Sequence, residues 1–352
     1  MNKSKKWIIN LLITSAVALF ACASFNYFID PLWLFTHSNK FNNKQMVINE
    51  RLQKSNKIYY SKKNNYDAIL IGSSRTSYIN QYDFGDIKTF NYSVASLRAH
   101  EYNDYINYAK AYNGKSLKYI FIGVDFFTTN KNFEERNEET SLEEIGTPFH
   151  RLKTILTFDV LKYSFKNFRN NFIKKIRVYY NRKNVKYRKM PKSINISKIV
   201  KKGLKKYRQE NYNNYEYNDL KKIYKNVLEN NPDSKIVVFV NPISGKLFEL
   251  MVELNLIDNY IEWLKDLEES FGSYYTFMYK NSITDNFEKN YYDTGHYNSD
   301  VGKLIVYKLT GNSKEKIPED FGILVTKENL ESVCNMIENQ ANIIKENNKE
   351  PE

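Results

Sequence analysis

Cysteine is scarce in this chain. Among 352 residues there are only Cys22 and Cys334, and Cys22 lies inside an apolar segment near the N-terminus. Two cysteines so placed exclude a disulfide framework and a cysteine-rich metal site. Hydrophobic residues make up 42% and charged residues 26%, which excludes wholesale disorder and a polytopic membrane protein. No internal repeat is present, and the length suits one large domain or two smaller ones.

Charge is absent from positions 7–29, which follow Lys3, Lys5 and Lys6. These 23 residues would span roughly 34 Å as a helix, enough to cross a hydrocarbon core of about 30 Å. Because the lysines favour the cytoplasmic side, we expect residues 1–6 to be a cytoplasmic stub. The sequence thus predicts a single-pass anchor in the cell membrane with an extracytoplasmic body. A cleaved signal peptide, or a lipoprotein modified at Cys22, remains an alternative.

Beyond the span, the pattern predicts a mixed α/β domain. Asp30 and Pro31 close the apolar run, and residues 30–66 are polar, as expected of a juxtamembrane linker. Short apolar runs then alternate with helical patterns across residues 67–312, which predicts a mainly parallel sheet with helices on both faces. The expected strands are Asp67–Gly72, Ile87–Tyr92, Leu117–Val124, Lys235–Val240 and Tyr274–Tyr279. The expected helices are Leu97–Tyr112, Tyr215–Glu229, Leu247–Glu269 and Ser299–Leu309. For residues 313–352 we expect a C-terminal helix and a charged tail.

Residues 130–214 interrupt this alternation and are strongly basic in part. From Arg151 to Lys206 there are 19 Lys or Arg and one acid, Asp159, a local charge of +18, whereas the whole chain carries +13. The apolar residues of this stretch recur at helical spacing, so we expect a basic helical insertion. Its charge would attract polyanions. An extracytoplasmic location favours anionic lipid or an anionic polymer and speaks against nucleic acid; a solvated charged face is the simplest alternative.

Reactive side chains follow the ends of the predicted strands, where open α/β sheets bind ligands. Ser74 follows the first strand, and Asp293 and His296 follow the fifth. A serine is a weak nucleophile unless an imidazole takes its proton, and a carboxylate fixes the tautomer of that imidazole. Ser73 and Ser74 could instead cap a helix, and Asp293 with His296 could cap another or bind a metal, although no further ligands are evident. The Gly-x-Ser-x-Gly elbow of α/β-hydrolases is absent.

The four blocks in chain order resemble those of SGNH/GDSL hydrolases. They are Gly72-Ser73-Ser74, Asn91 followed five residues later by Ser96, Gly123-Val124-Asp125, and Asp293-Thr294-Gly295-His296. The chain is most similar to the membrane-anchored branch associated with cell-surface polysaccharide O-acylation, which includes the D-alanyl lipoteichoic-acid transfer proteins. The resemblance implies a three-layer flavodoxin-like fold across residues 67–312.

The resemblance also assigns roles. Ser74 matches the nucleophile, His296 the general base and Asp293 its orienting acid. The oxyanion hole would use the backbone N–H groups of Ser74 and Ser96, with Asp125 where the family has a donating Asn. An ionised carboxylate repels an oxyanion, so Asp125 must be protonated, turned away or engaged elsewhere.

Arg75 and the overall activity each leave alternatives. Arg75 is either an ion-pair partner or a substrate-binding residue. The expected activity is serine-dependent O-acyl transfer, with acetyl the best candidate group, to a cell-surface or secreted polysaccharide. No cofactor or metal is expected. A multi-spanning membrane O-acyltransferase would be the partner that delivers the acyl group. A carbohydrate esterase and a catalytically inactive scaffold of an export complex are the alternatives.

Overall fold

A computed structural model describes residues 3–61, 64–133, 142–173, 176–190, 193, 195–311 and 316–348. The chain divides into two compact units. The first combines Met1–Asn64 with Glu138–Lys189, and the second combines Asn65–Asn137 with Met190–Glu352. This division differs from the expected one, because residues 30–64, expected to be a linker with some helix, belong to the first unit, and the expected insertion, 130–214, is shared between the two units.

The first unit begins with one long apolar helix, α1 (Lys3–Ile29, 27 residues). It is long and apolar enough to cross a membrane, in agreement with the predicted anchor. Its continuation is folded: a three-stranded antiparallel sheet in the order β1-β5-β6 accompanies three helices and a 3₁₀ turn. These elements are β1 (Gln45–Met46), α2 (Glu50–Tyr60), η5 (Leu142–Gly146), α4 (His150–Ile155), α5 (Phe158–Phe172), β5 (Val178–Tyr180) and β6 (Lys186–Arg188).

Side-chain amides fill much of the interior of this unit. Gln45 donates to the carbonyl of Ile29 (2.6 Å), and from α2 Gln53 donates to that of Pro31 (2.8 Å) and Asn56 to that of Leu32 (2.9 Å). The chain leaving α1 cannot satisfy these carbonyls within a helix, because Pro31 stops it. Gln53 and Asn56 therefore fasten the end of α1 to α2, and Gln45 fastens it to β1; these polar residues of 30–66 are interior residues.

Ionised groups are buried beside these amides. Glu50 accepts from Lys186 Nζ (2.8 Å) and from the Tyr180 hydroxyl (2.7 Å). Burial alone would raise the pKa of Glu50, but the ammonium groups of Lys186 and Lys54 outweigh it and lower that pKa to about 2. Burial lowers the pKa of Lys54 to about 7, although Glu50 opposes the shift.

The second unit contains a six-stranded sheet in the order β11-β8-β7-β4-β2-β3. Its strands are β2 (Ala68–Gly72), β3 (Thr89–Asn91), β4 (Tyr119–Val124), β7 (Lys235–Val240), β8 (Ser273–Thr276) and β11 (Ile323–Thr326). Five pair in parallel and β11 joins the edge antiparallel. In chain order this is 6-5-4-3-1-2, the flavodoxin-like doubly wound arrangement, so the predicted mainly parallel sheet is confirmed.

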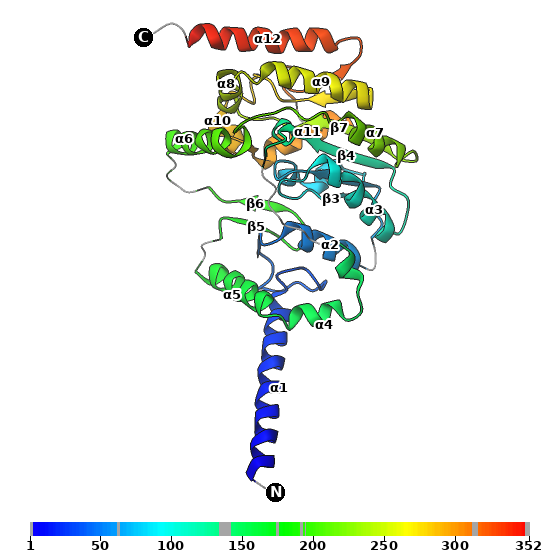
Figure 1. Ribbon diagram of the computed structural model, residues 1–352, viewed down its shortest axis with the longest axis vertical. Coiled ribbons are helices and arrows are strands. Elements are labelled where there is room, and N and C mark those ends of the chain that lie inside the picture. Colours follow the sequence, from blue (N-terminus) through cyan, green and yellow to red (C-terminus); the bar gives the residue numbers. More distant parts are fainter. Residues whose placement is uncertain are drawn as a thin grey trace. The chain divides into compact units, whose positions relative to one another are not determined.

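Both faces of this sheet are covered. Leu70, Phe121 and Phe239 share one apolar cluster with Val301 and Ile305 of α11. The alternate residues of the same strands are buried as well, as expected of a parallel sheet between two helical layers. Helix α3 contacts β2, helix α9 contacts β8, and α7 packs against α9 (Figure 1). The helices of this unit are α3 (Tyr102–Tyr112), α6 (Ile196–Lys206), α7 (Lys221–Glu229), α8 (Gly245–Glu253), α9 (Ile257–Phe271), α10 (Phe287–Asn290), α11 (Ser299–Thr310) and α12 (Leu330–Asn347).

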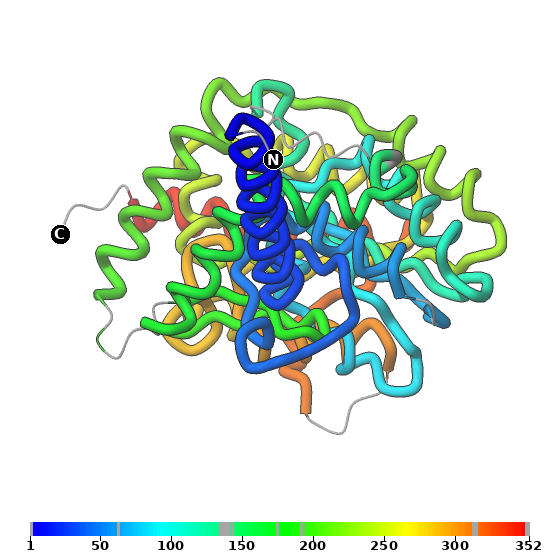
Figure 2. The backbone as a smooth tube through the Cα atoms, turned by 90° about the horizontal axis from the view of Figure 1, so that it is seen from below, coloured from blue at the N-terminus to red at the C-terminus, as the bar shows by residue number. Residues whose placement is uncertain are grey.

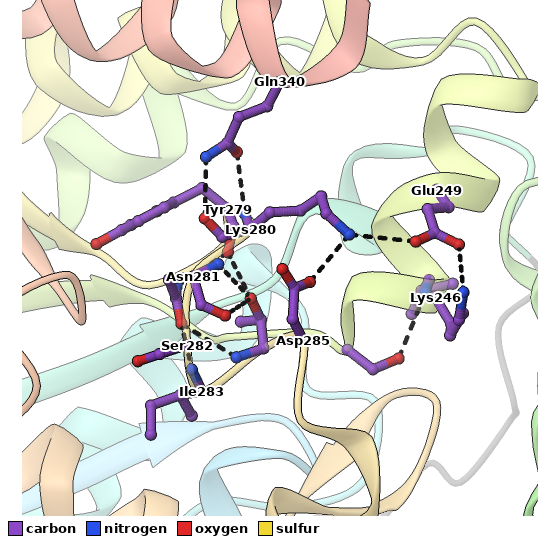
Figure 3. Close-up of polar contacts among 12 residues, drawn as sticks. Lys246, Glu249, Tyr279, Lys280, Asn281, Ser282, Ile283, Asp285 and Gln340 are labelled. Atoms are coloured by element: carbon purple, nitrogen blue, oxygen red, sulfur yellow. Dashed lines mark hydrogen bonds and ion pairs between the residues drawn. The ribbon is translucent and has the colours of Figure 1, made fainter. Parts of the chain in front are cut away.

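Two expectations for this unit need correction. The expected helix over 247–269 is broken into α8 and α9, with Asn255 between them in the left-handed conformation (φ 55°). In the C-terminal region the expected helix is present as α12, which packs on α8 and α9, but the strand β11, which extends the sheet, was not expected. Figure 3 shows the attachment: Gln340 of α12 accepts from the backbone N–H of Lys280 (3.0 Å) and donates to its carbonyl (2.9 Å). The end of the expected charged tail, residues 349–352, lies outside the described residues.

Candidate active site

The candidate site lies where β2 and β4 end side by side. In the sheet, β2 has β3 as its neighbour on one side and β4 on the other. The chain therefore winds in opposite directions from β2, which makes this the switch point of the sheet. The two strand ends approach closely, since a Cβ added at Gly72 would lie 2.7 Å from the carbonyl oxygen of Gly123. Glycine is therefore required at the turn that leads into Ser73 and Ser74.

Ser74 is half-buried, and its hydroxyl lies 2.9 Å from Nε2 of His296, which is 222 positions away in the sequence. Neither serine caps a helix by its side chain. The short 3₁₀ turn that follows, η1 (Thr76–Tyr78), has no side-chain cap, and Ser73 Oγ accepts only a local bond from the backbone N–H of Arg75.

Asp293 and His296 belong to a two-stranded hairpin, β9 (Tyr291–Asp293) and β10 (His296–Tyr297). Asp293 Oδ1 lies 2.8 Å from His296 Nδ1 and also accepts from the backbone N–H groups of Gly295 and His296. Because an ionised carboxylate only accepts, Nδ1 carries the proton and Nε2 is left to accept from Ser74. Asn298 caps α11, so Asp293 does not serve as that cap.

The three predicted triad residues thus form one hydrogen-bonded chain. The hairpin turn fixes the carboxylate through backbone bonds, and the carboxylate fixes the imidazole. The ring of Tyr78 packs edge-on against His296 at 5.8 Å between ring centres. This arrangement has the connectivity of a serine nucleophile, a base and an orienting acid.

Asp125 does not fit the role of third hydrogen-bond donor in the oxyanion hole. It is 2% exposed and its carboxylate lies 2.6 Å from Nη1 of Arg75, which is 1% exposed. A carboxylate ionised against a guanidinium has no proton to donate. Asp125 is therefore engaged in the buried ion pair that was one alternative for Arg75.

Arg75 links three parts of the site. Besides Asp125, it donates from Nε to the carbonyl of Gly295 (2.8 Å) and from Nη2 to the hydroxyl of Tyr207 (2.9 Å). Burial alone would lower the pKa of Arg75, but Tyr207 and Asp125 outweigh it and raise that pKa. The residue after the nucleophile thereby holds the turn that carries His296. Its expected substrate-binding role has no support in this geometry.

Ser96 lies in the loop after β3 and adopts a left-handed backbone conformation (φ 53°). Glycine takes this conformation at least cost, and glycine is what the resemblance leads us to expect at this position. The backbone of Val94 donates to the carbonyl of Gly72 (3.0 Å), so this loop begins next to the nucleophile turn.

Two buried residues that the sequence analysis did not select complete the site. Asn241, directly after β7, donates to Thr76 Oγ1 (3.1 Å) and accepts from the Tyr297 hydroxyl (2.9 Å). The strand-end rule could have found it, had it been applied to the fourth strand. The other is Tyr207, whose hydroxyl accepts from Arg75 and whose ring would collide with a side chain at position 295, where the chain has Gly295. Tyr207 lies in the expected insertion, where no sequence pattern pointed to it.

Helix α6 packs over the catalytic hairpin. A side chain at Gly203 would collide with Thr294, so glycine permits the close approach of this helix. The opposite side of α6 carries lysines that are exposed to solvent: Lys198, Lys201, Lys202, Lys205 and Lys206. Part of the predicted basic insertion thus lies at the site itself.

Within the described ranges, no three His, Cys, Asp or Glu side chains are grouped so as to hold a metal ion. The site offers a nucleophile, a base and an acid, which suits acyl transfer through a covalent intermediate. Compared with known proteins, the chain matches no family model, no curated protein and no solved structure.

Proposed function

We propose that this protein is a membrane-anchored serine-dependent O-acyltransferase that modifies a cell-surface or secreted polysaccharide. The observation that carries the proposal is the Ser74–His296–Asp293 chain, with links of 2.9 and 2.8 Å, at the switch point of the sheet. Helix α1 supports the anchor. The acceptor class and the extracytoplasmic location come from the resemblance and from the lysines that precede α1.

The proposed chemistry has two halves. Ser74 Oγ attacks the acyl carbonyl as His296 Nε2 takes its proton, and the donor's leaving group departs with that proton, which leaves an acyl-serine. A sugar hydroxyl then gives its proton to His296 and attacks the acyl-serine; the proton returns to Ser74 Oγ as the new ester leaves. Asp293 stabilises the imidazolium in both halves.

Other groups of the site position the reacting ones. The backbone N–H groups of Ser74 and Ser96 would face the tetrahedral oxyanion, without a contribution from Asp125. Arg75 would keep the hairpin turn at a fixed distance from the nucleophile through its bond to the Gly295 carbonyl. A multi-spanning membrane O-acyltransferase is the proposed source of the acyl group.

The test is active-site labelling of the full chain in mild detergent with a fluorophosphonate. We expect stoichiometric labelling that is lost in Ser74→Ala and reduced about 10³-fold or more in His296→Ala. Ser332→Ala and His100→Ala, which change an exposed serine and an exposed histidine, serve as matched controls. If the wild-type chain does not label, or labels at another residue, the site is inert and the protein is a scaffold.

Acceptor preference separates transfer from hydrolysis. The unlabelled full chain is given an activated acetyl ester with and without a polysaccharide acceptor, and both acetate and acetylated glycan are measured. Glycan acetylation that requires Ser74 supports the transferase. Release of acetate alone, unchanged by the acceptor, would make the protein an esterase of the same design.

A further inference from the structure

The first unit has an exposed apolar face that its own fold leaves uncovered. The exposed phenylalanines among the described residues, apart from Phe41 and those of α1, all lie on or beside α4 and α5. We call this the α4–α5 face; its large exposed apolar residues are Phe149, Leu152, Leu156, Phe158, Phe165, Phe172 and Ile173. Large apolar side chains gathered on one surface indicate an interaction site.

The face follows from the period of α5. Phe158, Phe165 and Phe172 are seven residues apart, so they line one side of the helix, and they are 68%, 59% and 79% exposed. Val160, Ser164 and Asn167 form the opposite, buried side. Asn167 anchors that side, because its Oδ1 accepts from the backbone N–H of Met46 (2.8 Å).

Basic side chains lie between the exposed phenylalanines. By helical spacing Lys162, Lys166 and Arg169 share the outer side of α5, and all three are exposed. Lys162 Nζ lies 4.7 Å from the centre of the Phe158 ring. Residues 149–173 contain five Lys or Arg and one acid, Asp159. A helix with one solvent face made of aromatic rings and cations suits the boundary between acyl chains and anionic headgroups.

The position of the face relative to α1 identifies the surface it meets. Asn26 of α1 donates to the carbonyl of Ile155 in α4 (2.8 Å), and the rings of Phe25 and Phe168 meet edge-on at 5.9 Å. About 20 helical residues cover a hydrocarbon core of roughly 30 Å, so a span that starts at Trp7 ends near Asn26. Figure 1 shows α4 and α5 at this end of α1, and Figure 2, seen from below, shows them beside it.

We propose that α4 and α5 lie in the interface of the same bilayer that α1 spans. Phe158, Phe165 and Phe172 insert at the acyl boundary, and Lys162, Lys166 and Arg169 contact anionic phospholipid headgroups. The first unit is then held by the membrane at two places, the span and the α4–α5 face. This proposal is independent of the chemistry of Ser74.

The experiment places an environment-sensitive fluorophore at single cysteines of the full chain, reconstituted in vesicles, after both native cysteines are replaced by serine. One label is attached at Phe165→Cys. The matched control is Tyr187→Cys, an aromatic residue of the same unit that is 41% exposed but lies outside the face. Quenchers attached to lipid chains and a water-soluble quencher report the depth of each label.

We expect the label at position 165 to be quenched from the lipid and protected from water, and the label at 187 to behave in the opposite way. In equal parts of phosphatidylcholine and phosphatidylglycerol, the triple change Lys162→Gln, Lys166→Gln and Arg169→Gln should reduce the depth at 165. In pure phosphatidylcholine the same change should have little effect.

Two results would overturn the proposal. One is a label at 165 that remains as accessible to water as the label at 187 in both vesicle types. The other is a label that is exposed in pure lipid vesicles but protected in native membranes, which would mean that a membrane protein covers the face. Reconstituting the two single-cysteine chains in parallel guards against a misfolded unit, since the label at position 187 must keep its expected signal.

Discussion

The buried pair of Arg75 and Asp125 allows a quantitative test of the site's architecture. The ionised groups are 2.6 Å apart and nearly inaccessible to solvent. Removing one partner of a buried pair costs about 3–5 kcal/mol, because the other charge remains without compensation. In Asp125→Asn the amide oxygen can still accept from Arg75, so we expect a smaller loss, about 2–3 kcal/mol.

Arg75→Met should cost more, about 4–5 kcal/mol, because it strands the Asp125 carboxylate and also removes donors from Gly295 and Tyr207. The double variant has no buried unpaired charge. We therefore expect its loss of stability to be smaller than the sum of the two single losses by about 2 kcal/mol.

Unfolding of the second unit can be followed by one tryptophan. Trp263 is buried in α9, and its ring centre is 5.8 Å from that of Phe126, the residue after Asp125. In a background with Trp7→Phe and Trp33→Phe, urea titration of the full chain in detergent would give the free energies. If the stability losses of the two single variants add up to the loss of the double variant within about 0.5 kcal/mol, the pairing is refuted. A rise in fluorophosphonate labelling of about 10²-fold in Asp125→Asn would instead return this position to the oxyanion hole.

Three further changes test other parts of the molecule. Asp293→Asn should lower the rate of Ser74 labelling by roughly 10⁴-fold, since the imidazole loses its fixed tautomer; a loss below tenfold would contradict the relay. Gly203→Leu should force α6 away from Thr294 and reduce labelling, whereas Lys201→Leu on the exposed side of α6 should not, as measured by labelling rates at equal folded fraction. Lys54→Met should change how the stability of the first unit depends on pH. The pKa of Lys54 is near 10.5 in the unfolded chain and about 7 in the folded one, so the stability of the wild-type unit falls by about 1.4 kcal/mol for each pH unit below 10.5, down to about 7. The variant should lack this slope when unfolding is followed by Trp33 fluorescence.

Much of the second unit could be predicted because its strands are buried on both faces. Such strands appear as unbroken apolar runs, and the strand-end rule correctly places Ser74 at the end of β2. His296 reaches it from the β9–β10 hairpin, which is not part of the six-stranded sheet. The partner of Asp125 could not be predicted in the same way. Spacing places both Arg75 and Asp125 at strand ends, but only packing decides whether an arginine turns inward to an acid or outward to a ligand.

The first unit was missed for a different reason. Pattern analysis assigns polar residues to the surface, whereas Gln53, Lys54 and Asn56 are fully buried. Gln53 and Asn56 satisfy the carbonyls of Pro31 and Leu32. The strand β11 was missed because it falls in residues 313–352, where the sequence analysis expected only a helix and a charged tail. The family assignment has no support from the comparisons, and the catalytic roles stay predictions until labelling is measured.

The distance in sequence between Ser74 and His296 also has a consequence for the synthesis of the protein. The ribosome makes α1 and the nucleophile early, and the hairpin that carries the base only after more than two hundred further residues. A growing chain, or one shortened before residue 293, therefore has a serine with no base to activate it. Strand β2 pairs with β3 and β4, both of which follow it in the chain, so its pairing must likewise wait for them. If Ser74 is the nucleophile we propose, emergence of the hairpin is thus the step that completes the site.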